Sequence, residues 1–231
     1  MPRAFFRTVL VALPMLPLSA CGDPLRLVLV EAGGSTALVQ GGSDSGGTGG
    51  GQAGSAPEPV SPCELVTPEA PWNAPVLYTA SYVSALYPGQ YMRHIETQGF
   101  IGTIDLQLTP DKEGASFEVI PGVWDCECIS LRAVNLNGAL LRHAGSRVYM
   151  NPAVDTPLYL ADSTFCPEPG LADPEGLSFR SVNYPQRMIH LRNSNELWID
   201  DIVRAPPATA EQAMLFASEA TFYREAALFE R

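Results

Sequence analysis

The sequence predicts an all-β fold, specifically a β-trefoil, in which three four-strand repeats surround a pseudo-threefold axis. The first observation is a phrase that occurs three times, as YPGQYMRH at 87–94, LNGALLRH at 136–143 and YPQRMIHL at 184–191. The second is that the copies, aligned from Ser81, Ser130 and Ser178, start 49 and then 48 residues apart. Three copies at this period indicate one supersecondary unit used three times, whereas a propeller needs more blades and a solenoid needs caps.

Each repeat is expected to contain four strands, because its segments carry β-branched and aromatic residues at every second position. The first strand is a Ser-x-aromatic segment, the second carries an Arg-His pair, and the fourth carries a Thr/Ser-Phe pair. The third strands are variable and are predicted at 101–108, 147–150 and 195–199. Residues 210–217 predict one or two helical turns. Apolar residues at matching places predict a shared core: Tyr82, Leu131 and Phe179, then Phe117, Phe165 and Phe222.

The N-terminus is typical of an exported lipoprotein. Residues 1–20 have a basic start, an apolar stretch and small residues at the end, and they are too short to span a membrane. The text Leu18-Ser19-Ala20-Cys21 resembles a bacterial lipobox, so we expect cleavage before Cys21 and diacylglycerol on its thiol. This places the protein in the bacterial cell envelope, anchored in the lipid bilayer at the periplasmic face or the cell surface. The alternative is ordinary cleavage near Ala20, with a free thiol at Cys21.

The chain after the signal divides into a tether and a domain. Residues 21–60 are predicted to be a disordered linker, whose Gly/Ser stretch at 41–56 would span roughly 20–25 Å. The β-trefoil domain is expected at 61–231, which is long enough to bury a core of its own. Its three lobes are predicted at about 77–125, 126–173 and 174–231.

Charge and cysteine content exclude two classes of partner. The net charge is −11, and loss of residues 1–20 would remove two arginines and leave 12 basic against 25 acidic residues, or −13. Such a chain is not expected to bind nucleic acid, which requires clustered cations. Besides Cys21 there are four cysteines, Cys63, Cys126, Cys128 and Cys166, and in an exported chain an even number predicts two disulfides. Their spacing does not fit zinc, so we expect neither metal nor cofactor.

The repeats also resemble a known family. The text SYVSALYPGQYMRH, ADSTFCPEPGLAD, GLSFRSVNYPQR and SEATF is similar to the arabinose-binding domain of α-L-arabinofuranosidase B, a family 42 carbohydrate-binding module. The resemblance covers about 77–228. It implies a β-trefoil that holds arabinofuranosyl branches of arabinoxylan or arabinan in shallow pockets, each formed by the His of Arg-His and the Asp of Asp-Ala-Thr-Phe. A carboxylate and an imidazole are suited to hydrogen-bond sugar hydroxyls.

Carried over residue by residue, the resemblance distinguishes the three repeats. The second repeat has both residues, His143 and Asp162, and is expected to hold the competent pocket. The third has Glu219 at the Asp position, but Leu191 stands at the His position and His190 falls where the Arg would be, so Glu219 is expected to be a weaker sugar ligand than Asp162. In the first repeat His94 remains while Gly114 replaces the Asp, so that His94 is either a weak ligand or a structural residue.

The resemblance also implies a disulfide between Cys128 and Cys166, across the second repeat. Cys63 would then pair with Cys126, provided that Cys21 is lipidated. Arg93 and Arg142 are interpreted as structural residues that bridge strand ends.

The leading functional hypothesis is a monomeric, membrane-anchored protein that binds arabinose-containing polysaccharide and lacks a catalytic module. One alternative is α-L-arabinofuranosidase activity, although no pair of facing carboxylates is evident in the sequence. Another is an interaction scaffold whose sugar pockets have decayed.

Overall fold

The computed structural model describes residues 61–67, 69–201 and 209–230. The chain separates into units at residues 1–54 and 55–231, and the first unit lies wholly outside the described residues. The predicted signal, Cys21 and the linker therefore remain predictions. Where the chain is described, no helix is long and apolar enough to cross a membrane.

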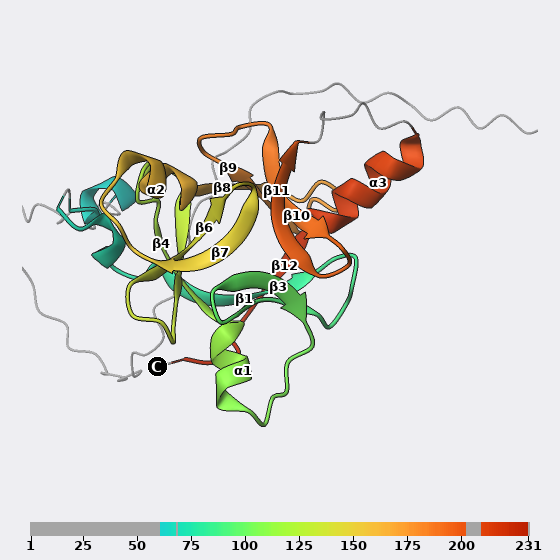
Figure 1. Ribbon diagram of the computed structural model, residues 1–231, viewed down its shortest axis with the longest axis horizontal. Coiled ribbons are helices and arrows are strands. Elements are labelled where there is room, and N and C mark those ends of the chain that lie inside the picture. The colour runs from blue at the N-terminus through green and yellow to red at the C-terminus, as the bar shows by residue number, and fades with distance from the viewer. Residues whose placement is uncertain (1–60, 68, 202–208, 231) are drawn as a thin grey trace, which may run out of the picture. The chain divides into compact units, whose positions relative to one another are not determined.

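The described residues of the second unit form twelve antiparallel strands, which confirms the all-β prediction (Figure 1). The strands are β1 (Tyr78–Ser84), β2 (Tyr91–Ile95), β3 (Gln98–Gly102), β4 (Phe117–Pro121), β5 (Ile129–Ala133), β6 (Ala139–Ala144), β7 (Arg147–Pro152), β8 (Phe165–Pro169), β9 (Leu177–Ser181), β10 (Arg187–Arg192), β11 (Glu196–Asp201) and β12 (Phe222–Glu225). Each repeat thus contributes four strands in the same order.

The strand pairings repeat three times. Six strands pair in a closed series, β1–β4–β5–β8–β9–β12–β1. The other six form the hairpins β2–β3, β6–β7 and β10–β11, and the second strands of these hairpins pair with one another as β3–β7, β7–β11 and β11–β3. Residues that are equivalent in the sequence repeats are therefore equivalent in the pairing.

Helices are more numerous than predicted. The expected helical turns at 210–217 are present in α3 (Ala210–Glu219), but α1 (Thr109–Gly114) and α2 (Pro157–Asp162) occupy the same place in the other repeats, outside the strands (Figure 1). Six residues are too few to show a 3.6-residue stripe. The start of α2 carries a sequence signal for a helix, because Thr156 is followed by a proline and its hydroxyl accepts the Tyr159 N–H. Short 3₁₀ turns, Pro62–Leu65 and Pro71–Asn73, precede β1.

The predicted third strand of the first repeat, 101–108, is wrong beyond Gly102. In the register, Ile95 lies opposite Gln98, so β3 begins immediately after a tight turn. Beyond the strand the chain turns again, because the Asp105 carboxylate accepts the N–H of Gln107 and draws the backbone out of the extended conformation. The third strands of the other repeats, β7 and β11, agree with the prediction to within two residues.

The core contains the apolar residues predicted from the repeat. Tyr82, Leu131, Phe179, Phe117, Phe165 and Phe222 are all fully buried. The rings of Tyr82 and Phe179 meet edge to face with centroids 5.1 Å apart. Truncation of such a phenylalanine to alanine typically costs about 3–5 kcal/mol, so this core accounts for a large share of the stability.

The serine at the start of each repeat connects a helix end to the first strand. Each side chain is fully buried, and its hydroxyl donates to the carbonyl of the residue that follows a helix. The three bonds are Ser81 to Ala115 (2.7 Å), Ser130 to Ser163 (2.7 Å) and Ser178 to Ala220 (2.8 Å). Because the last residue of each helix comes directly before this carbonyl, the bonds fix the positions of Gly114, Asp162 and Glu219.

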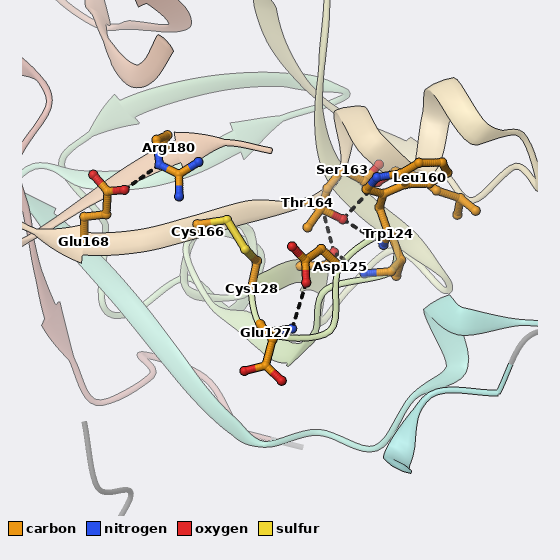
Figure 2. Close-up of a disulfide and its surroundings, with 12 residues drawn as sticks. Trp124, Asp125, Glu127, Cys128, Leu160, Ser163, Thr164, Cys166, Glu168 and Arg180 are labelled. Carbon is orange, nitrogen blue, oxygen red and sulfur yellow. Dashed lines mark hydrogen bonds and ion pairs between the residues drawn. A yellow bond between two sulfur atoms is a disulfide. The ribbon is translucent and has the colours of Figure 1, made fainter. Parts of the chain in front are cut away.

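Both predicted disulfides are present, and Figure 2 shows the one inside the second repeat. Cys128 and Cys166 are 38 residues apart in the sequence. By closing the loop between them, their bond stabilises the fold by about 3–4 kcal/mol. Cys63 bonds to Cys126 and holds the segment before β1 against the domain. Near the Cys128–Cys166 disulfide, the Thr164 hydroxyl donates to the Leu160 carbonyl and accepts the N–H of Trp124, which stabilises the loop before β5 (Figure 2).

Candidate functional site

The second repeat contains a pocket of about 240 Å³ in which His143 and Asp162 meet. Its lining residues come from the β6–β7 hairpin, α2 and the beginning of the third repeat: Arg142, His143, Ala144, Gly145, Ser146, Leu158, Asp162, Tyr184 and Arg187. The two predicted ligands are thus brought together from different elements. His143 and Asp162 are only 3% and 4% exposed, so they form the floor of the pocket.

Asp162 is held in one orientation by three neighbours. It is the last residue of α2, where its Oδ2 accepts from Arg142 Nη2 at 3.0 Å. Its Oδ1 accepts from Asn183 Nδ2 at 2.8 Å and lies 3.4 Å from His143 Nε2. Arg142 thus connects β6 to the last residue of α2, where a bridge between strand ends was expected. A carboxylate oxygen accepts more than one hydrogen bond, so a ligand hydroxyl can still be bound.

His143 is neutral at neutral pH. Its burial lowers the pKa of the imidazole, the charge of Asp162 opposes this effect, and Arg142 and Arg187 add to it. Its Nε2 lies 3.0 Å from Asn183 Oδ1, and since that oxygen only accepts, Nε2 is assigned the proton. The Nδ1 atom is then an acceptor. The carboxylate of Asp162 and the imidazole of His143 thus lie side by side, with Oδ1 3.4 Å from Nε2.

The sequence reasoning missed Asn183, Tyr184 and Arg187, which belong to the third repeat. Asn183 bridges Asp162 and His143, and the Tyr184 ring lies 5.4 Å from the imidazole. A signal was present in the segments RAVNL and RSVNY, where an asparagine recurs at the same repeat position, as Asn135 and Asn183. Its role could not be recognised because each asparagine acts on the preceding repeat.

A tight turn completes the pocket. Gly145 and Ser146 both have positive φ, +55° and +71°, as the two central residues of a type I′ hairpin turn require. The turn brings Ser146 Oγ within 3.1 Å of Arg187 Nη1. The Arg187 guanidinium also lies over the Tyr184 ring, 4.7 Å from its centroid. Arg187 and Tyr184 therefore form one wall of the pocket.

The first repeat does not reproduce this geometry. His94 uses both nitrogens inside the protein: Nδ1 lies 2.9 Å from the Glu96 carbonyl and Nε2 lies 2.9 Å from Asn135 Oδ1. Gly114 ends α1 where an acid would stand, and Arg93 pairs with Asp111 at 2.9 Å instead. These contacts favour the structural interpretation of His94.

The third repeat contains a different histidine–carboxylate cluster. Leu191 is in the core, while His190 occupies the arginine position and faces Asp200 at 2.5 Å and Glu219 at 3.5 Å. Arg192 binds the same Asp200 through two nitrogens. Burial would raise the pKa of Asp200, but hydrogen bonds from Arg192 and His190 outweigh it and hold that pKa low. Glu219 is therefore where the repeat predicted it, beside a histidine that the motif does not supply.

One group of possible metal ligands occurs among the described residues, Cys63, Cys126 and Glu127. The two sulfurs are bonded to each other, so they offer no thiolate to a metal.

The chain matches the family described as the alpha-L-arabinofuranosidase B (ABFB) domain over residues 80–224. The probable alpha-L-arabinofuranosidase B of Aspergillus niger is 33% identical over 104 residues, which are 42% of this chain and 20% of that protein. Alpha-L-arabinofuranosidase B of Aspergillus oryzae is 30% identical over 122 residues, which are 49% and 23% of the two proteins.

Solved structures gave similar results. A GH54 α-L-arabinofuranosidase soaked with a cyclic sulfate inhibitor aligns with a TM-score of 0.57 and 26% identity, over 66% of this chain and 31% of that one. An arabinofuranosidase complexed with arabinofuranosyl-α-1,2-xylobiose aligns with a TM-score of 0.57 and 25% identity, over 65% and 31%. The chain spans about a fifth of the length of the curated relatives it matches.

Proposed function

The chain belongs to the alpha-L-arabinofuranosidase B domain family, and on this premise we propose that it binds an arabinofuranosyl branch of plant polysaccharide in the pocket of the second repeat. The observation that carries the proposal is the convergence of His143 and Asp162 on one pocket of about 240 Å³. Arabinoxylan and arabinan are the polymers that carry such branches. The similarity to an arabinofuranosidase complexed with arabinofuranosyl-α-1,2-xylobiose agrees with this ligand class.

The pocket supplies what a furanose requires. Asp162 can accept a sugar hydroxyl through a charge-assisted bond, and the imidazole of His143, which lines the same pocket, can hydrogen-bond a second hydroxyl. Leu158 and Tyr184 are 64% and 41% exposed and present an apolar wall beside these groups. One sugar held in this way should bind with a Kd of about 0.1–1 mM, or about −4 to −5.5 kcal/mol.

We further propose that the domain is a β-trefoil of the type found in family 42 carbohydrate-binding modules. The closed series of six strands and the three mutually paired hairpins support this assignment. In this arrangement each pocket would lie between one repeat and the next, as the contact from Asn183 to Asp162 suggests.

Binding without hydrolysis is favoured by the carboxylates present. Glycosidases use two, about 5–5.5 Å or about 6.5–9.5 Å apart. Among the described residues that line this pocket, Asp162 is the only acid. The competing hypothesis is arabinofuranosidase activity, the activity in the names of the relatives. Release of arabinose from an aryl arabinofuranoside by the purified chain would support that hypothesis and contradict ours.

We also propose that Cys21 is lipidated and that the anchor holds the domain at the bacterial cell envelope. The lipobox-like text before Cys21 supports this. Many anchored copies would raise the avidity for a polymer far above the affinity of one site. Mass spectrometry of the mature N-terminus tests the anchor: a diacylated Cys21 is expected, and a free amino-terminal cysteine without lipid would contradict it.

Retention on insoluble arabinoxylan tests the binding proposal. The full chain should be retained and should elute with soluble arabino-oligosaccharide. Asp162→Asn should abolish retention, because loss of a charged hydrogen-bond partner typically costs about 1.5–3 kcal/mol, or roughly tenfold to a hundredfold in affinity. Asp155→Asn is the matched control, since Asp155 is exposed in the same repeat and does not line the pocket. If the wild-type chain washes through, or if both variants are retained equally, the proposal is wrong.

A further inference from the structure

The pocket of the second repeat contains one positive charge that no acid in it balances. Asp162 is paired with Arg142 at 3.0 Å, so these two charges compensate each other. Arg187 lines the same pocket, but its contacts are a hydroxyl, Ser146 Oγ at 3.1 Å, and the face of the Tyr184 ring at 4.7 Å. Asp201 lies opposite it in the strand register, yet in the described part of the chain no carboxylate oxygen lies within 4.0 Å of the Arg187 guanidinium.

This cation is a departure from the repeat. The equivalent residues are Gln90 in the first repeat and Ala139 in the second, so the fold does not require an arginine there. The chain is strongly acidic, with 25 acidic against 14 basic residues. Arg187 is also half-buried and close enough to His143 for its charge to lower the pKa of that imidazole. An arginine at this place is explained better by a ligand than by folding.

We infer that the pocket prefers an arabinofuranosyl branch whose neighbouring sugar carries a carboxylate, so that the ligand class is an arabinosylated polysaccharide that contains uronate. The inference rests on the proposed function and specifies its substrate class. Asp162 and His143 would hold the neutral furanose at the floor, while Arg187 at the wall would bind the carboxylate of the adjacent residue.

The geometry suits such a contact. A guanidinium binds a carboxylate through two parallel N–H···O bonds in its own plane. The Tyr184 ring covers a face of the Arg187 guanidinium, and this stacking leaves the edge of the group for an anion. Ser146 occupies Nη1, so the edge formed by Nη2 and the other N–H groups would meet the uronate.

The test compares two probes on the purified full chain by titration calorimetry. One is an arabinosylated xylo-oligosaccharide that carries a single glucuronate beside the arabinose-bearing unit, and the other is its carboxyl-reduced, neutral counterpart. The acidic probe should bind about fivefold more tightly at low salt, a ratio at the upper end for an exposed ion pair. That ratio should fall toward one at about 0.5 M salt, where such a pair is screened.

Variants show whether Arg187 is the cause of the higher affinity for the acidic probe, measured as the ratio of the two affinities. Arg187→Gln should reduce it to about one, and Arg187→Lys should keep part of it. The matched control is Arg224→Gln, because Arg224 also lies over a tyrosine, Tyr78 at 5.1 Å, and does not line the pocket. Its ratio should stay near fivefold.

The outcomes separate the two proposals. If both probes bind equally, the uronate inference is wrong and arabinose binding stands. If neither probe binds, the proposed function fails and the inference fails with it. Equal loss of the ratio in Arg187→Gln and Arg224→Gln would mean that the overall charge of the chain, and not this pocket, selects the acidic probe. Tight binding of free glucuronate would show an anion site independent of arabinose, which would also overturn the inference.

Discussion

Replacement of Asn183 by alanine should destabilise the domain more than the same change at the equivalent Asn135. Asn183 Nδ2 donates to the Asp162 carboxylate at 2.8 Å, and its Oδ1 accepts from Ser181 Oγ at 2.8 Å and lies 3.0 Å from His143 Nε2. Asn135 Oδ1 has one such contact, 2.9 Å from His94 Nε2. Asn183 thus makes two more hydrogen bonds than Asn135, one to a charged group and one neutral.

The expected magnitudes follow from this difference. A hydrogen bond to a charged group typically contributes about 1.5–3 kcal/mol and a neutral one about 0.5–1.5 kcal/mol. Both asparagines are half-buried, which favours the lower values. We therefore expect Asn183→Ala to reduce the free energy of unfolding by about 2–3 kcal/mol and Asn135→Ala by about 1 kcal/mol.

Urea denaturation of the full chain, followed by tryptophan fluorescence, measures both values. Retention on arabinoxylan should be lost in Asn183→Ala, because Asp162 and His143 lose the residue that orients them, and kept in Asn135→Ala. Equal destabilisation of the two variants would refute the reasoning. So would unchanged retention of Asn183→Ala, since the pocket would then not depend on a residue from the next repeat.

Three further predictions concern pH, the disulfide and the serine motif. Burial holds the pKa of His143 below its ordinary value of 6.5, so the stability that the neutral imidazole contributes is fully present above that pH and is lost as the pH falls through the folded-state pKa. Thermal melts from pH 7.5 to 5 should therefore show a steeper loss of melting temperature for wild type than for His143→Gln. Parallel curves for the two proteins would contradict this. Double replacement of Cys128 and Cys166 by alanine should cost about 3–4 kcal/mol in urea denaturation without dithiothreitol, and a cost below about 1 kcal/mol would mean that the loop is already constrained. Ser130→Ala should cost about 1–3 kcal/mol, because the carbonyl of Ser163 and the N–H of Val123 both lose a buried partner; a thermal melt unchanged from that of wild type would show that water replaces the hydroxyl.

The repeat explains why much of the fold could be predicted. A period of 48–49 residues with matching apolar positions determines which residues are equivalent, and equivalent residues such as Phe117, Phe165 and Phe222 are buried together. The serine that begins each repeat was recognised as a marker, but its function in the fold appears only in the contacts that it makes. The short helices were missed because a six-residue element has no periodicity to detect.

The site could be predicted only in part, for a related reason. Alignment within the repeats identified His143 and Asp162, which belong to one copy of the unit. It could not identify Asn183, Tyr184 and Arg187, because the contacts that matter run from the third repeat to the second.

The third repeat illustrates the same limit. By sequence, His190 stands at the arginine position and so has no role in the motif. In the structure it faces Glu219 and Asp200, which come from α3 and β11. A residue's partners depend on which elements pack beside it, and a comparison of equivalent positions contains no information on this.

The sequence alone therefore determined the all-β class, the threefold unit, the disulfide pairs by resemblance, and the two residues on which the binding proposal rests. These features are local or periodic, and they are encoded within a single copy of the repeat. The tertiary structure alone decided where the pocket lies, which neighbours orient Asp162 and His143, and that Arg187 adds a charge beside them. Those features arise where two repeats meet, and side chains distant in sequence are brought within hydrogen-bonding distance only when the chain has folded.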